Sequence, residues 1–218
     1  MKCIHCNHPY TYVLGNKQRK CSRCKRKFSP AKIQREKALR NAFTNGLSAT
    51  QTSRELQMHI ATVLKHFDRF RRDIAFECDV HYQHHAHLVT DYDEYLYLPK
   101  SLDPKKDIGK VKHFLTLAYE GKVYNLMMPS IARLGLDTEN RNERKLLEKY
   151  LTFRKISKLS TQRSTIRRFW EYFESFICQY KGVGDDRFVF YLKEAEWRFN
   201  RGIPPAPKRS RRRLEESR

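Results

Sequence analysis

The 218-residue sequence lacks any apolar run long enough to cross a bilayer, which excludes an integral membrane protein. It also lacks a recognisable signal peptide, so we expect a cytoplasmic, nucleoid-associated protein whose cysteines stay reduced. Acidic residues are scarce, because 24 Asp and Glu stand against 45 Lys and Arg, for a formal net charge of +21. Such a charge attracts polyanions, so double-stranded DNA is the expected partner and no small-molecule substrate is expected.

The positive charge is unevenly distributed along the chain. Residues 1–75 contain 17 Lys and Arg against 4 Asp and Glu, a net charge of +13. Residues 204–218 are proline-rich and then basic, and we expect them to be disordered until they meet DNA. A basic chain can also be merely soluble, ribosomal or bound to a membrane surface. Hydrophobic residues make up 39%, enough for one or two modest cores, in which we expect Cys78 and Cys178 as buried free thiols.

Four cysteines at the N-terminus form two Cys-x-x-Cys pairs, Cys3 with Cys6 and Cys21 with Cys24, separated by 14 residues. A two-residue spacer lets one tight turn present two thiolates to one ion, and two such turns complete a tetrahedral Zn²⁺ site. The pattern predicts a zinc ribbon over residues 1–30. Disulfides are the alternative pairing, and His5 or His8 could replace one thiolate. We expect Phe28 to pack against the metal site, and the exposed cations before it to face DNA phosphate: Lys25, Arg26 and Lys27.

The sequence pattern of residues 31–77 predicts a three-helix domain. Apolar spacing predicts one helix that stops at Asn45-Gly46, a short helix over Ala49–Leu56 capped by Ser48, and a longer one over Ile60–Phe76. Its apolar face is expected to contain Ile60, Val63, Leu64, Phe67, Phe70 and Ile74. The segment resembles a helix-turn-helix, although Gln57 occupies the turn position that usually holds glycine. A plain three-helix bundle is the alternative.

If the segment binds DNA, the start of the third helix would enter the major groove. The residues expected to face base edges are His59, Ala61, Thr62, Lys65 and His66. Further along the helix, the arginines expected to contact backbone phosphates are Arg69, Arg71 and Arg72. Residues 78–90 are then expected to be a connector rich in histidine. His81 and His85 would share one face of a helix and permit a second metal ion, but a solvated linker is the preferred interpretation.

Residues 91–203 are predicted to form a second domain, so that the whole chain belongs to the α+β class. Alternating and β-branched segments predict strands at 91–98, 111–119 and 122–128, with a hairpin signal at Glu120-Gly121, and a short strand at 155–159. Helices are predicted at 137–153, 165–180 and 185–200. Strands followed by helices fit a compact layered α/β domain.

The order of these elements resembles the zinc-ribbon branch of bacterial insertion-sequence transposases. The resemblance is carried by the ribbon, the helix-turn-helix and four short motifs: Asp93-Glu94-Tyr95, Phe169-Trp170, Lys181-Gly182-Val183 and Arg198-Phe199-Asn200-Arg201. It extends to about residue 202. It implies an RNase H-like domain whose acidic triad holds two Mg²⁺ ions for DNA strand transfer, and recognition of the ends of an insertion sequence.

The acidic triad that this resemblance implies is incomplete in the sequence. Asp93 matches the first acid, but the segment 155–161 contains no Asp or Glu. Arg167 stands where the third acid is expected, and a cation there would repel Mg²⁺. Glu171 and Glu174 are possible substitutes. The remaining acids that could contribute are expected to be helix-surface or capping charges: Asp137, Glu139, Glu194 and Glu196.

Three hypotheses follow from this pattern. The first, which the missing acids favour, is a DNA-binding transposase-like protein with a degenerate catalytic domain. The second is an active transposase that uses unconventional acids and therefore Mg²⁺. The third is a domesticated zinc-ribbon regulator or adaptor. Binding to paired DNA sites would require a homodimer, which the sequence permits.

Overall fold

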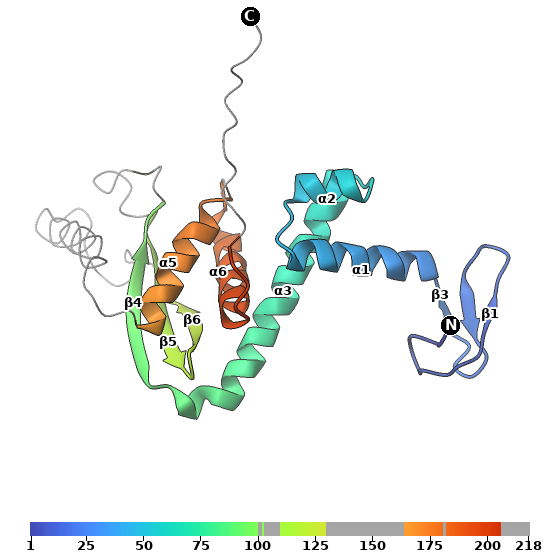
Figure 1. Cartoon of the computed structure of the whole chain (residues 1–218), viewed down its shortest axis with the longest axis horizontal. Coiled ribbons are helices and arrows are strands. Elements are labelled where there is room, and N and C mark those ends of the chain that lie inside the picture. The colour runs from blue at the N-terminus through green and yellow to red at the C-terminus, as the bar shows by residue number, and fades with distance from the viewer. Residues whose placement is uncertain (100–101, 103–109, 130–163, 181, 206–218) are drawn as a thin grey trace, which may run out of the picture. The chain divides into compact units, whose positions relative to one another are not determined.

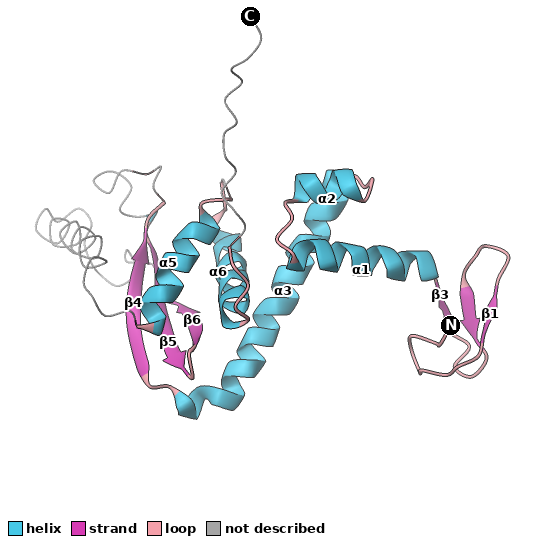
Figure 2. Cartoon of the chain, in the orientation of Figure 1, coloured by secondary structure: helices cyan, strands magenta, loops and turns pink. Residues whose placement is uncertain are grey.

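The computed structural model describes residues 1–99, 102, 110–129, 164–180 and 182–205. These residues form a mixed α and β structure with two three-stranded antiparallel sheets, as the predicted α+β class requires (Figures 1 and 2). The chain divides into two compact units, Met1–Phe70 and Arg71–Arg218. The helix predicted at 137–153, the strand predicted at 155–159 and the tail from residue 206 lie outside the described residues. No helix within the described ranges has the length and apolar character to cross a membrane.

The first unit begins with a small sheet of order β1-β2-β3, whose strands are Thr11–Val13, Arg19–Cys21 and Lys27–Phe28. The turn between β1 and β2 is closed by the Lys17 N–H, which donates to the carbonyl of Leu14 at 2.9 Å. Phe28 is buried and packs beside Cys3 and Cys21, as the sequence predicted. With so few apolar residues, this sheet has almost no hydrophobic core of its own.

Three helices follow, and their starting points are set by side-chain caps. They are α1 (Pro30–Thr44), α2 (Ala49–Glu55) and α3 (Ile60–His85). The Ser29 side chain accepts the Lys32 N–H, and Pro30 occupies the first helical turn of α1. Ser48 and Gln51 form a capping box at α2, which satisfies backbone N–H groups that the helix cannot.

Aromatic side chains join these helices. The Phe43 ring from α1 lies 5.0 Å from Phe67 and 5.6 Å from Phe70 of α3, between ring centroids. Two residues predicted on the apolar face of α3 are instead exposed, Ile60 at 40% and Leu64 at 45%. Ile60 lies in the first turn, at the end of the buried row, and Leu64 is rotated about 100° from the buried Val63.

Helix α3 runs nine residues past the predicted end at Phe76. The segment expected to be a connector over 78–90 is therefore the last part of α3 and the short helix η1 (Ala86–Leu88). No glycine or proline interrupts this segment, and Ile74 and Cys78, which belong to the second unit, are buried within it. The expectation of a solvated linker was wrong for that reason.

The second unit contains a sheet of order β4-β5-β6, formed by Asp91–Tyr97, Lys112–Tyr119 and Lys122–Met127. Glu120 and Gly121 join the last two strands with positive φ angles of 46° and 74°, as a tight hairpin turn requires. Two helices follow, α5 (Thr165–Ile177) and α6 (Asp185–Asn200). The predicted strands and helices are confirmed here, with ends that differ by at most three residues.

Both faces of this sheet are covered. Helices α5 and α6 lie against one face and bury an aromatic core (Figure 1) that includes Tyr95, Phe114, Phe169, Trp170, Phe173, Phe188 and Leu192. The opposite face packs against the end of α3 and η1 through a smaller cluster of Leu117, Tyr119, Tyr124, Tyr82, Leu88 and Val89. Cys78 is buried as expected, but Cys178 is exposed at the C-terminal end of α5.

Candidate metal centre and nucleic-acid interface

The four N-terminal cysteines converge on one point. Their Sγ atoms all lie within 4.8 Å of one another, and two Sγ pairs, Cys3 with Cys24 and Cys6 with Cys21, are separated by 3.6 Å. A tetrahedral ion with metal–sulfur bonds of about 2.3 Å requires sulfur–sulfur distances of about 3.8 Å. The cluster can therefore hold a metal ion such as Zn²⁺. His5 and His8 do not belong to it.

The two cysteine turns have the same backbone construction. The residue after each second cysteine, Asn7 and Lys25, has a positive φ of 57° and 58°. That conformation turns the chain back under the sulfur atoms. In each turn backbone N–H groups point at the first sulfur: His5 donates to Cys3 at 3.4 Å, and Arg23 donates to Cys21 at 3.3 Å.

The N–H groups at Cys21 favour its thiolate form. Burial by itself would raise the pKa of Cys21, but the N–H groups of Cys24 and Arg23 more than compensate and lower it to about 6. At Cys24 the N–H of Arg26 also lowers the pKa, but burial and the neighbouring cysteine sulfur atoms outweigh it and raise that pKa to about 11. Binding of a metal would therefore release the proton that Cys24 still holds.

The basic residues that follow the cluster are available to a partner. Lys25, Arg26 and Lys27 are all exposed, whereas Phe28, the next residue, is buried. Residues 1–30 contain 8 Lys and Arg and no Asp or Glu. The surface of this metal-binding segment is therefore uniformly cationic.

The turn between α2 and α3 explains how Gln57 replaces the expected glycine. Gln57 has a positive φ of 49°, so the position does require the left-handed conformation that glycine adopts most easily. Ser53 donates its hydroxyl to the carbonyl of Met58 at 2.6 Å and fixes the turn. His59, Thr62 and Lys65 are exposed where α3 begins.

Two of the predicted DNA contacts on α3 also bind within the protein. Glu36 from α1 lies 3.2 Å from His66 Nδ1 and forms an ion pair with Arg69. The side chain of Arg69 is still 50% exposed, so one side of its guanidinium group remains accessible. Glu36 therefore orients the His66 and Arg69 side chains at the edge of the exposed surface.

Arg71 was predicted to bind DNA phosphate, and the structure contradicts this. Arg71 is 3% exposed, and its Nε donates to Glu194 Oε2 at 2.7 Å. Burial opposes the charged form of Arg71, but the Glu194 carboxylate outweighs it and raises the pKa of the guanidinium group. Arg72, the next residue, is exposed, with its guanidinium carbon 5.3 Å from the centre of the Phe190 ring.

Glu194 and Glu196 were expected on the helix surface, and both are instead completely buried in α6. Glu194 accepts hydrogen bonds from Arg71 and, at 2.9 Å, from Arg198 Nε. Leu192 and Ala195 are buried beside them, so α6 is covered over more than one stripe. One sign of this burial was present in the sequence: Glu194 stands between the apolar residues Leu192 and Ala195.

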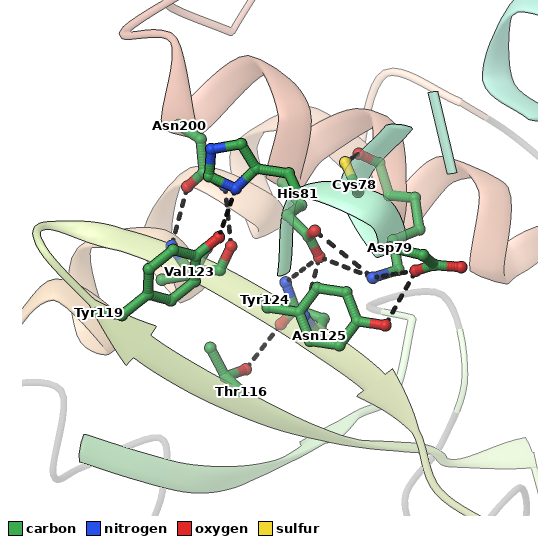
Figure 3. A network of polar contacts seen from close by, with 11 residues as sticks. Cys78, Asp79, His81, Thr116, Tyr119, Val123, Tyr124, Asn125 and Asn200 are labelled. Atoms are coloured by element: carbon green, nitrogen blue, oxygen red, sulfur yellow. Dashed lines mark hydrogen bonds and ion pairs between the residues drawn. The ribbon is translucent and has the colours of Figure 1, made fainter. Parts of the chain in front are cut away.

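Glu196 belongs to a buried polar network at the sheet (Figure 3). Both the backbone N–H and the side-chain Nδ2 of Asn125 donate to Glu196 Oε2, at 2.8 and 3.0 Å. Lys193 Nζ lies 3.3 Å from Glu196 Oε2 and 3.3 Å from Asp79 Oδ1. Burial raises the pKa of Glu196 even though Lys193 and Asn125 favour its charged form. The network connects α3, β6 and α6.

The acids proposed for catalysis are placed around the edge of the aromatic core. Asp93 lies on β4 opposite Thr116, and its Oδ1 accepts the N–H of Glu94 at 2.8 Å. Glu174 accepts a hydrogen bond from the Tyr95 hydroxyl, and Glu171 is exposed, 3.8 Å from Arg167 Nε. Among the described residues, the cysteine cluster is the only group of three or more metal-binding side chains that could share one ion. Asp137 and Glu139 lie outside the described residues.

His81 and His85 do share one face of α3, as their spacing predicted. Their rings stack at 4.2 Å, His81 Nδ1 lies 3.1 Å from the Tyr119 hydroxyl, and His85 Nδ1 lies 2.7 Å from the carbonyl of His81. Burial is the main cause that lowers the pKa of His81. The pair therefore joins the end of α3 to β5.

No protein-family model, curated protein or solved structure matches the chain.

Proposed function

We propose that this chain is a DNA-binding protein of the transposase type whose catalytic centre is degenerate. Residues 1–30 act as a zinc ribbon, and α2 and α3 act as a helix-turn-helix that recognises the ends of an insertion sequence. Residues 91–203 correspond to an RNase H-like domain. The observation that carries the proposal is the exposed start of α3, where His59, Thr62 and Lys65 follow a capped helix and a left-handed turn.

The positive surface of the first unit supports binding to a polyanion. Lys25, Arg26 and Lys27 neutralise phosphates together with Arg69, and their contacts position the protein without reading sequence. His59, Thr62 and Lys65 supply the contacts to base edges. Zn²⁺ at the four cysteines is structural, because all four positions of a tetrahedral shell are taken by protein sulfur.

The residues at the expected catalytic positions of the second unit support the proposed loss of catalytic activity. A two-metal site needs several carboxylates around each pair of ions. Ser164 caps α5 by accepting the Arg167 N–H at 3.2 Å, and this helical turn is where the transposase resemblance requires an acid. It presents a serine and an arginine instead. Glu174 is already engaged by the Tyr95 hydroxyl.

The proposal is tested with the zinc-loaded full chain and a pool of random duplex DNA. We expect selection of a defined duplex, whose affinity falls steeply between 50 and 200 mM salt, roughly as the number of neutralised phosphates predicts. Lys65→Ala should weaken binding about 5-fold or more and change the base preference at one position. Arg187→Ala, which removes an exposed cation from the second unit, is the matched control and should bind normally.

Three results would contradict the proposal. Equal affinity of Lys65→Ala and the parent chain would remove α3 from the interface. Absence of any duplex binding at low salt would instead favour a protein-binding adaptor. Mg²⁺-dependent strand transfer that Asp93→Asn abolishes would show that catalysis survives.

A further inference from the structure

The small sheet of residues 1–30 has two chemically different faces. The strand pairing places Tyr12 opposite Lys20, and Lys20 opposite Lys27. Directly paired residues on neighbouring strands point to the same face of a sheet. These three side chains therefore form a row across β1, β2 and β3. We call this row, together with Tyr10, the aromatic-basic face.

The other face of the same sheet contains the alternate residues. Phe28 is opposite Arg19 on that side, and both Phe28 and Cys21 are buried against the cysteine cluster. Arg19 donates through Nε to Thr11 Oγ1 at 2.8 Å. The part of this face around Cys21 and Phe28 is thus covered by the cysteine cluster, although Val13 at its end is exposed, whereas Tyr10 and Tyr12 on the aromatic-basic face lie toward solvent.

The tyrosines on this face are exposed. Tyr12 is 61% and Tyr10 is 72% exposed, so both rings are accessible to an external base. Period-two alternation puts Tyr10 on the same side as Tyr12, about 7 Å further along the chain. Ser22, which follows β2 directly, fixes this end of the sheet by donating its hydroxyl to the Tyr10 carbonyl at 3.1 Å.

We propose that the aromatic-basic face binds single-stranded DNA, with unpaired bases stacked on Tyr10 and Tyr12 and phosphates beside Lys20 and Lys27. Aromatic rings next to cations are the general means of holding single strands, because every base has a face that can stack. The absence of Asp and Glu from residues 1–30 supplies the charge complementarity. In a duplex the base faces are covered by their neighbours, so these rings select unpaired nucleotides.

This inference deepens the proposed DNA-binding function and rests on it. It gives the first unit two DNA-binding surfaces, with Lys27 shared between them: α3 together with Lys25 and Arg26 for duplex, and the aromatic-basic face for the unpaired strand. A protein with both would hold a junction at which duplex DNA opens into a single strand, such as a frayed or cleaved end.

The test uses the zinc-loaded full chain with fluorescent oligothymidine and, separately, with the duplex selected above. Tyr12→Ala should lower the affinity for oligothymidine about tenfold and leave duplex affinity within twofold. Tyr12→Trp should retain or raise the affinity for oligothymidine, because the larger indole ring can still stack on a base. Val13→Ala is the matched control, since Val13 is 66% exposed on the same strand but points to the opposite face, and it should bind as the parent does.

A second measurement locates the contact. Oligothymidine containing 5-iododeoxyuridine should cross-link on irradiation to a peptide that contains Tyr10 or Tyr12. Equal oligothymidine affinity of Tyr12→Ala and Val13→Ala, with duplex binding intact, would overturn this inference alone. If the parent chain bound neither duplex DNA nor oligothymidine, the proposed function would be overturned as well.

Discussion

The two units of this protein use charged residues in opposite ways. In the first unit cations are exposed around a metal-binding cluster, and residues 1–30 hold no acid to neutralise them. In the second unit Arg71, Lys193 and Arg198 are buried and paired with Glu194 and Glu196. The same residue types are therefore exposed to solvent in one unit and paired inside the fold in the other.

The units also differ in what holds them together. Residues 1–30 have Phe28 and the four cysteines at their centre, so we expect their stability to depend on a metal ion held by the four sulfur atoms. The second unit has a core of large aromatic side chains between α5, α6 and the sheet. This comparison predicts that metal removal and core disruption act on separate parts of the molecule.

The largest expected effect is that of Cys6→Ser. Metal ligation at such sites contributes roughly 10–16 kcal/mol and is itself the folding free energy of the segment. We expect loss of the bound zinc and rapid hydrogen exchange throughout residues 1–30, while α5 and α6 keep their protection. Elemental analysis and hydrogen-exchange mass spectrometry measure both.

Cys178→Ser is the control for this change, because Cys178 is exposed and distant in sequence from the cluster. It should keep one zinc per chain. If Cys6→Ser also kept one zinc with unchanged exchange, the four-cysteine metal site would be wrong.

Glu194→Ala should have the next largest effect, and in the second unit. It removes the carboxylate that both Arg71 and Arg198 contact in a buried site. Removing one partner of a buried ion pair costs about 3–5 kcal/mol, because the remaining charge is desolvated without compensation. Urea unfolding monitored by tryptophan fluorescence measures this, and zinc content should not change.

The matched control is Glu171→Ala, which removes a carboxylate that is 56% exposed and 3.8 Å from Arg167. Its expected cost is at most about 1 kcal/mol. If Glu194→Ala and Glu171→Ala lowered the free energy of unfolding equally, burial would not determine how much each ion pair of this unit contributes to stability.

Glu196→Gln should have the smallest effect, and one that depends on pH. Burial raises the pKa of Glu196, so the folded state binds its proton more readily than the unfolded state does. Stability due to this group is therefore full below the unfolded pKa of about 4.3 and is lost as pH rises through the higher folded pKa. The glutamine variant has no charge to bury, and its amide oxygen can still accept the hydrogen bonds from Asn125.

The variant should consequently match the parent in free energy of unfolding near pH 4 and become more stable than the parent as the pH approaches neutrality. Urea titrations at pH 4, 5.5 and 7 measure the difference. A glutamine variant that became less stable relative to the parent with rising pH would show that the ion pair with Lys193 outweighs burial.

Local patterns in the sequence were reliable for individual elements. The predicted strands at 91–98, 111–119 and 122–128 and the helix at 185–200 are present, because alternation and helical spacing are properties of neighbouring residues. Cap and turn residues such as Ser48 and Gly121 fixed where elements start or reverse. The end of α3 was missed, since only contacts with the second unit show why the helix continues to His85.

Candidate site residues divided in the same way. The cysteine cluster followed from spacing, because two turns of fixed length bring four sulfur atoms together. Arg71 did not, since it lies two residues after Arg69 and one before Arg72 in an evenly basic run. Only the burial of Arg71 beside Glu194 distinguishes it from its exposed neighbour Arg72.

The sequence alone therefore determined the elements, the metal ligands and the excess of positive charge, because each depends on short-range spacing or on composition. Tertiary structure decided which charges meet solvent and which are paired inside. It also decided that Arg71 pairs with Glu194, far along the chain, and that Tyr12, Lys20 and Lys27 from three strands lie in one row. Strand pairing and burial join residues that are distant in sequence, and no local pattern specifies them.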